Sequence, residues 1–202
     1  AAYAIIAYQT AFLKTYYPHE FFAASMSMEL SNQKKLSEFY EELKRLGINI
    51  IRPDINKCYA DFSSDGKNFL YALGAIKSVG FEAISKIVEE RNKNGVFKDL
   101  TDFINRVNPK YINKLQLEGL VKAGAFDNLY KNRHSLYNSI PNIILKSKNI
   151  FENNSANQID LFQEDNDETY LDIIEDWTVD VKLSKEFETL GFFISDHPLN
   201  QY

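Results

Sequence analysis

Cysteine and histidine are scarce in this sequence, which has one cysteine, Cys58, and three histidines among 202 residues. A single cysteine cannot form a disulfide within the chain. The histidines are scattered and no second cysteine accompanies them, so the ligand spacing of a zinc site is absent. These shortages exclude a disulfide-based scaffold, and we expect neither a metal site nor a cofactor in this chain.

Long apolar runs are also missing, because none approaches the roughly 18–20 residues that a membrane helix needs. No charged and then apolar leader opens the chain. We therefore expect a cytoplasmic protein without a membrane partner. The first residue is Ala1 rather than Met, and a helical pattern begins at once, which indicates a piece of a longer protein.

The residues that are present suffice to build a core, since 45% are hydrophobic and 14% aromatic. Short segments with extended patterns, at 48–51 and 192–194, and a small β-hairpin turning at 64–66 interrupt an otherwise helical sequence. The sequence therefore predicts a mainly α fold. Apolar residues at helical spacing, bounded by proline, glycine or capping residues, predict helices over 3–16, 18–26, 31–47, 81–92, 100–107, 117–123, 133–145 and 183–190.

Charge is distributed unevenly along the chain, although the net charge is only -5. Residues 66–150 contain 14 basic and 7 acidic side chains, whereas residues 151–202 contain 2 basic and 13 acidic ones. Such an asymmetry favours a polyanion-binding middle beside a part that avoids DNA. Chance variation among solvated faces is the alternative.

The segment at 73–80, LGAIKSVG, leads directly into a predicted helix and so predicts a helix, a tight hairpin and a second helix. Amides at a helix N-terminus lack intrahelical partners, and the helix dipole favours an anion there. We expect the amides around Ser78, Val79 and Gly80 to bind a DNA phosphate, with Lys77 and Lys86 adding salt-dependent attraction. The alternative is an ordinary corner at which glycine only reverses the chain.

A looser form of the same pattern follows further along the chain. A predicted helix ends near Lys122, Gly124 and Ala125, and another begins after Lys131, near Arg133, with Pro141 interrupting it. We expect these residues to form a second DNA-contacting corner, which would make the domain a tandem helix-hairpin-helix.

Residues 152–170 are crowded with polar and acidic side chains, which predicts a mobile linker. One apolar island interrupts it. An exposed apolar pair in a charged linker favours a docking peptide, and a short strand or loop folded back on the domain is the alternative. The island consists of Gln158, Ile159, Asp160, Leu161 and Phe162.

Catalytic interpretations find little support in the sequence. Serine, aspartate and histidine stand side by side at 195–197, and consecutive residues cannot line up as nucleophile, base and orienting group. The carboxylate pairs at Glu89–Glu90 and Asp99–Asp102 lie in amphipathic helical segments, where solvated charge is the default. We assign no catalytic residue.

Several strings carry a resemblance to one family: YQTAFLK at 8–14, PDIN at 53–56, LGAIK at 73–77, KAGAFD at 122–127, GFFI at 191–194 and HPL at 197–199. Together they resemble the alpha subunit of bacterial DNA polymerase III over nearly the whole chain. The resemblance implies that residues 1–52 end a helical fingers region and that 53–150 form the helix-hairpin-helix domain. It further implies an acidic linker with a clamp-binding motif at 151–176, and a short α/β tail at 177–202 that leads to an OB domain.

The resemblance also implies function. Gln158 would hydrogen-bond at the rim of a pocket on the beta sliding clamp while Leu161 and Phe162 fill it, and Ile159 stands where the family prefers leucine. Ser78 departs from a hairpin that usually contains Gly-Val-Gly. The catalytic aspartates and the magnesium of the polymerase would belong to a palm upstream, so this chain is expected to be a non-catalytic part of a DNA-directed DNA polymerase.

Its expected partners are double-stranded DNA, the beta clamp and other holoenzyme subunits. A DNA-repair module and a structural helical adaptor remain alternatives.

Overall fold

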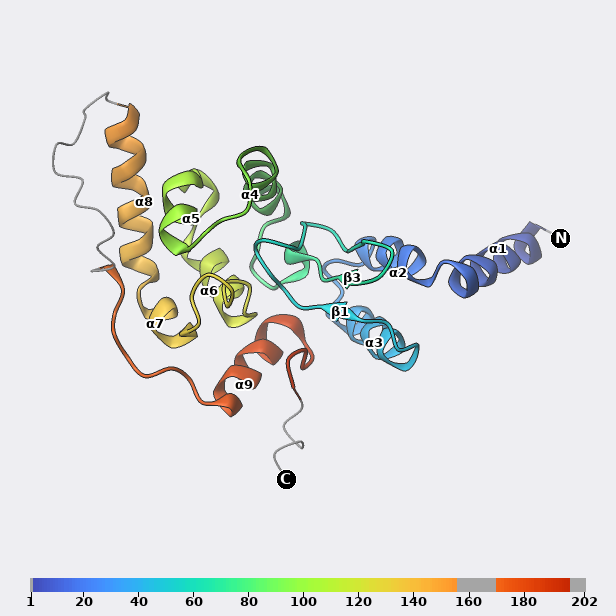
Figure 1. Cartoon of the computed structure of the whole chain (residues 1–202). Coiled ribbons are helices and arrows are strands. Elements are labelled where there is room, and N and C mark those ends of the chain that lie inside the picture. The colour runs from blue at the N-terminus through green and yellow to red at the C-terminus, as the bar shows by residue number, and fades with distance from the viewer. Residues whose placement is uncertain (1, 156–169, 197–202) are drawn as a thin grey trace.

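A computed structural model describes residues 2–155 and 170–196 (Figure 1). The protein is mainly helical with one small sheet, as the sequence predicts. Two single 3-10 turns are labelled η. In chain order the elements are α1 (Ala2–Tyr16), α2 (Pro18–Ser27), α3 (Gln33–Arg45), β1 (Ile50–Ile51), β2 (Ser63–Ser64), β3 (Phe69–Leu70), η1 (Leu73–Ala75), α4 (Phe81–Asn94), α5 (Leu100–Arg106), η2 (Pro109–Tyr111), α6 (Lys114–Lys122), α7 (Arg133–Asn138), α8 (Ile140–Ser155) and α9 (Val179–Leu190).

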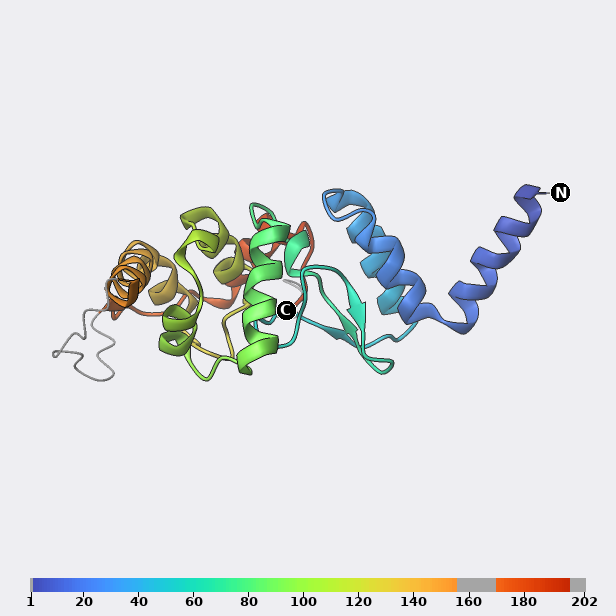
Figure 2. The same ribbon diagram turned by 90° about the horizontal axis from the view of Figure 1, so that it is seen from above.

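The N-terminal helices begin and end where the sequence predicts. Pro18 opens α2, the Asn32 side chain caps α3 by accepting the N–H of Lys35 at 3.3 Å, and Gly47 follows α3 with a φ of 70°. α3 packs on α2, whereas α1 projects away from the rest of the molecule (Figure 2). The large apolar side chains of α1 are therefore exposed: Tyr3, Ile5, Ile6, Tyr8, Phe12, Leu13 and Tyr16.

The predicted β-hairpin is present, because β2 pairs antiparallel with β3. The Asp65 side chain closes its turn by accepting the N–H groups of Lys67 and Asn68 at 2.9 and 2.6 Å. β1 joins β3 in parallel, so the strand order is β1-β3-β2. The sequence predicted that β1 is extended but not which strand it pairs with.

The structure corrects the prediction for residues 73–75, which precede the turn that leads into α4. The sequence predicted a helix there, but η1 is a single 3-10 turn. Gly74 donates its N–H to the carbonyl of Ala60 at 3.0 Å, and a Cβ on Gly74 would lie only 2.6 Å from that oxygen. Ile76 then becomes extended, with a ψ of 130°. The close strand-like contact at residue 74 leaves no room for another helical turn.

In the region from α7 to the tail the predicted interruption near Pro141 is present, whereas the end of α8 and part of the predicted linker differ from the sequence prediction. The chain breaks into α7 and α8 around Ser139, since Pro141, which lacks an N–H, is accepted only in a first helical turn. α8 continues to Ser155, past the predicted domain boundary at 150, and Tyr170 and Leu171, which fall inside the predicted linker at 151–176, are buried.

The tail begins with α9, which ends at Gly191 with a φ of 85°, as predicted. Residues 192–194 form no strand, with bends at Phe192 and Ile194 instead of the expected extended segment, so the predicted α/β tail has a helix and no strand within the described residues. Phe192 is buried there and stacks on Tyr40, with ring centroids 4.3 Å apart. None of the helices in the described ranges has the combined length and apolarity needed to cross a membrane.

Candidate nucleic-acid interface

The turn before α4 has a defined type. Val79 donates its N–H to the carbonyl of Ile76 at 3.1 Å, which closes a four-residue turn with Lys77 and Ser78 in its middle. Ser78 has a φ of 67° and is the single non-glycine residue with a positive φ in the described part of the chain, so Lys77 has a negative φ. This combination is a type II turn, whose third position favours glycine. Ser78 therefore occupies a left-handed conformation that costs an L-residue roughly 1–2 kcal/mol.

The N-terminus of α4 presents free amides. Gly80 is the N-cap residue, with a ψ of 131° and no side-chain cap, and its carbonyl accepts the first helical bond, from Ile84, at 3.1 Å. The N–H groups of residues 80–83 and of Ser78 have no acceptor among the described residues. Ser78, Gly80 and Phe81 are exposed. An anion can therefore reach several donors at the positive end of the helix dipole.

Two residues that the sequence predicted to bind the phosphate, Val79 and Lys86, contribute less in the structure. The N–H of Val79 is consumed by the turn itself, so it cannot bind a phosphate. Lys86 is exposed, but its Nζ lies 2.8 Å from Glu89 Oε2, and the hydrogen bond to Glu89 raises the pKa of Lys86. Its charge is therefore partly neutralised, whereas Lys77 is exposed without an ion pair among the described residues.

The hairpin rests on α6. A Cβ added to Gly119 would lie 2.8 Å from the carbonyl oxygen of Lys77 and 2.9 Å from Val79 Cγ2. A Cβ added to Gly80 would lie 3.1 Å from Gln116 Nε2. α6 thus approaches the hairpin backbone as closely as a residue without a side chain permits.

The second predicted corner, around Gly124, Ala125 and Arg133, does not form a phosphate site. Gly124 has a φ of 78° and ends α6 as expected, but a Cβ there would lie 2.7 Å from Arg133 Cζ, so the guanidinium fills the space in front of the glycine. Both corner amides are used internally: Gly124 donates to Val121 and Ala125 to Leu120, at 3.0 and 2.9 Å.

The basic residues of this corner are also engaged. The Arg133 side chain is 7% exposed and hydrogen-bonds to Asp127 at 2.6 Å and to Glu186 at 3.0 Å. The Lys122 side chain is 12% exposed and lies 2.8 Å from Glu188. Burial acts to lower the pKa of Lys122, but the hydrogen bond to Glu188 together with the nearby charges of Tyr137, Glu188 and Glu118 outweighs burial, so the pKa is raised. Lys131 alone of this group remains exposed, without an ion pair among the described residues.

A second turn-and-helix unit lies elsewhere, and sequence reasoning missed it. η2, Ile112 and α6 follow one another as η1, the hairpin and α4 do, and η2 contacts α4. Asn113 caps α6 in a capping box with Gln116. The sequence signal that could have revealed the unit is this capping box, which directly follows Ile112. No glycine stands in the turn itself, at 109–113, and the exposed positions of the unit include Lys110 and Lys114.

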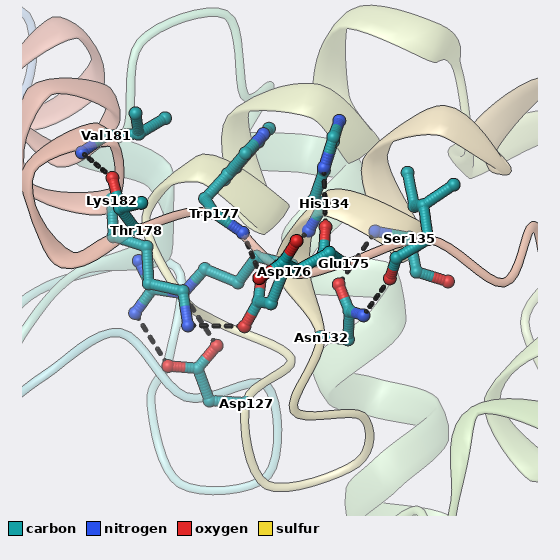
Figure 3. A network of polar contacts seen from close by, with 12 residues as sticks. Asp127, Asn132, His134, Ser135, Glu175, Asp176, Trp177, Thr178, Val181 and Lys182 are labelled. Atoms are coloured by element: carbon teal, nitrogen blue, oxygen red, sulfur yellow. Dashed lines mark hydrogen bonds and ion pairs between the residues drawn. The ribbon is translucent and has the colours of Figure 1, made fainter.

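The segment that follows the predicted docking peptide is anchored to α7 (Figure 3). Asn132 Nδ2 donates to the carbonyl of Ile174 at 2.7 Å, and the Ser135 hydroxyl donates to the carbonyl of Asp172. The N–H of His134 donates to Asp176 at 3.2 Å, and its ring stacks on Trp177, with centroids 5.5 Å apart. The docking peptide itself, residues 158–162, lies outside the described residues.

Neither a metal-ligand cluster nor a hydrolase triad forms among the described residues. No group of three His, Cys, Asp or Glu side chains suited to a metal ion occurs within residues 2–155 and 170–196. The Ser195 hydroxyl donates to the buried carboxylate of Glu186 at 2.6 Å, so it serves to fix the tail. His197 lies beyond the described residues.

Comparisons with known proteins point in one direction. A family model described as a helix-hairpin-helix motif matches residues 47–136, which include both turn-and-helix units. The DNA polymerase III subunit alpha of Caulobacter vibrioides is 41% identical over 98% of this chain. Those of Campylobacter jejuni and Escherichia coli K12 are 39% and 37% identical over the whole chain. In each case this chain spans 18% of the relative's length.

Proposed function

Because this chain belongs to the family of the DNA polymerase III alpha subunits, we propose that it is the segment of such a polymerase that grips the backbone of duplex DNA through the hairpin at 76–80. The observation that carries this proposal is the exposed N-terminus of α4, where Ser78 and residues 80–83 present unpaired N–H groups. Backbone donors at a helix N-terminus bind phosphate without reading base sequence. The binding is therefore independent of DNA sequence.

The η2–α6 unit extends this surface. Lys77, Lys110 and Lys114 are exposed and surround the two helix starts, which lie close enough for Gln116 of one to pack on Gly80 of the other. Each lysine that neutralises a phosphate releases a counterion, so affinity falls steeply with salt. This unit takes the role that the sequence suggested for Gly124 and Arg133.

The test is duplex-DNA binding at low salt, measured by fluorescence anisotropy. Lys77→Glu with Lys114→Glu should lower the affinity at least about tenfold, because each loses a phosphate contact and adds repulsion. The control is Lys98→Glu with Lys148→Glu, which makes the same charge change at exposed lysines of the basic middle region outside the hairpin surface. Equal losses in the two pairs would mean diffuse attraction and would refute the hairpin site.

A second function rests on the sequence at 158–162. We propose that Gln158, Ile159, Asp160, Leu161 and Phe162 dock on the beta sliding clamp and so tether the polymerase to it. The anchoring of residues 172–176 to α7 supports this, because it ties the described chain that follows the peptide to the domain. Leu161 and Phe162 supply apolar anchors worth roughly 1.5–3 kcal/mol each.

A clamp pull-down tests this second proposal. Leu161→Ala with Phe162→Ala should abolish capture while leaving the helical circular-dichroism signal unchanged. Ile173→Ala is the matched control, because it removes a fully exposed apolar side chain from the same acidic region. Capture of the double variant at the wild-type level would make the peptide a bystander.

The longer protein would be a DNA-directed DNA polymerase of the cytoplasm that works with magnesium and further holoenzyme subunits. We propose that its catalytic carboxylates lie outside this chain, so the chain alone transfers no nucleotide. A repair module would instead show lyase or nuclease activity, and a structural adaptor would show no salt-sensitive DNA binding.

A further inference from the structure

α9 lies beyond the matched motif at 47–136, yet it touches the hairpin directly. The carbonyl oxygen of Thr189, in the last turn of α9, accepts the N–H of Lys77 at 3.0 Å and the side-chain Nε2 of Gln33 at 3.1 Å. Carbonyls in the last turn of a helix have no intrahelical partner. One oxygen therefore joins three parts of the molecule: α3, the hairpin and α9.

We propose that α9 is a positioning element of the DNA-binding hairpin, acting through the bond between Thr189 and Lys77. The hairpin amides converge on a phosphate only when the turn is held at a fixed angle to α4. α9 holds one side of that turn and Gly119 of α6 supports the other. The inference rests on the proposed DNA binding.

α9 can hold the turn in place because two of its carboxylates attach it to neighbouring helices. Glu186 is 1% exposed and accepts hydrogen bonds from Arg133 Nη1 at 3.0 Å and from the hydroxyl of Ser195 at 2.6 Å. Glu188, the residue directly before Thr189, pairs with Lys122 of α6. These two carboxylates bind α9 to α6 and α7, so the position of the Thr189 carbonyl is determined by the body of the domain.

The geometry of the turn allows a substitution that removes only the hydrogen bond from the Lys77 N–H to the Thr189 carbonyl. Lys77 is the second residue of a type II turn, a position at which proline is common because its φ is already suitable. Ile76 before it has a φ of -71° and a ψ of 130°, the conformation that a following proline prefers. Lys77→Pro therefore keeps the turn and removes the N–H. Lys77→Ala removes the same charge and keeps the N–H.

Duplex-DNA affinity of the full chain separates the two variants. Lys77→Ala should bind duplex DNA about threefold more weakly than the wild type, because one phosphate contact is lost. Lys77→Pro should bind duplex DNA about a further five- to tenfold more weakly, because a turn that is no longer held can lose at most about the free energy of one net hydrogen bond. Its unfolding temperature should change little, since proline at a compatible turn position restricts the unfolded chain and so offsets the lost bond. Equal affinities of the two variants would overturn the inference.

Amide hydrogen exchange gives an independent readout that needs no DNA. Leu190, the last residue of α9, is fully buried, so Leu190→Ala should loosen the helix and speed exchange of the Lys77 N–H at least about tenfold, while lowering DNA affinity. Unchanged exchange at Lys77 with α9 loosened would also overturn the inference. If the wild-type chain bound no DNA at all, the proposed function would fail, and the exchange result would still decide whether α9 holds Lys77.

Discussion

The corners at Gly80 and Gly124 share a sequence pattern and differ in what surrounds them. Each glycine stands at a helix boundary with basic residues nearby. α4 starts immediately after Gly80, with its amides exposed and no side-chain cap. After Gly124 the next helix starts only at Arg133, whose guanidinium covers the glycine. The difference shows that glycine and positive charge do not make a phosphate site when carboxylates of the same chain can reach the cations.

The largest effect that separates the corners should come from Arg133→Ala. Removing this guanidinium leaves the carboxylate of Glu186 buried without its cation, which should lower the free energy of unfolding by about 3–5 kcal/mol in denaturant titrations. DNA affinity, measured where the variant is folded, should stay within about twofold. Lys131→Ala, at an exposed position, should change stability by less than about 0.5 kcal/mol. A folded Arg133→Ala protein with lost DNA affinity would restore this corner as a contact site.

Substitutions at the two left-handed positions, Gly124 and Ser78, should change the stability of the fold in opposite directions. Gly124→Ala forces a Cβ onto the Arg133 guanidinium and should cost on the order of 2–4 kcal/mol. Ser78→Gly relieves a φ of 67° and should stabilise the fold by about 1 kcal/mol. Thermal unfolding of the two variants checks this, and a destabilised Ser78→Gly protein would mean that the serine hydroxyl contributes more than its backbone costs.

The smallest effect should be pH-dependent and confined to the second corner. The hydrogen bond from Lys122 holds the pKa of Glu188 below its usual value. A carboxyl whose folded pKa is depressed stabilises the fold above its unfolded pKa, and the stabilisation is lost as pH falls through the folded pKa. Glu188→Gln should therefore lower the free energy of unfolding at pH 7 by less than about 1 kcal/mol, and its difference from wild type should vanish in acid. A difference that persists at low pH would point to packing instead.

Local features of the fold could be predicted from the sequence because their causes are local. Gly47, Gly124 and Gly191 end helices through a positive φ, and Asp99 caps α5 by accepting the N–H of Asp102 at 2.8 Å. The β-hairpin at 64–66 follows from its turn residues in the same way. Each of these signals lies within about four residues of its effect.

The missed features depend on partners far along the chain. Arg133 is buried by Glu186, 53 residues later, and Lys122 is paired with Glu188, 66 residues later. No local pattern announces either contact. Likewise the linker prediction failed at its end because Tyr170 is buried and its hydroxyl shares a hydrogen bond with that of Thr101, 69 residues earlier.

Gly80→Asp tests the central claim most directly, with duplex-DNA affinity measured from low to physiological salt. Gly80 has a φ of -79° and a ψ of 131°, which any L-residue adopts, and aspartate is a strong N-cap. A Cβ at this position would lie 3.1 Å from Gln116 Nε2, the end of a flexible side chain that can shift by a few tenths of an ångström. The new carboxylate should accept the free amides of α4, so the unfolding temperature should hold or rise while DNA affinity falls at least about tenfold and the salt slope becomes shallower. Gly80→Ala, which leaves those amides free, should bind DNA within about threefold of wild type. A Gly80→Asp protein that binds DNA as well as the wild type would contradict the account.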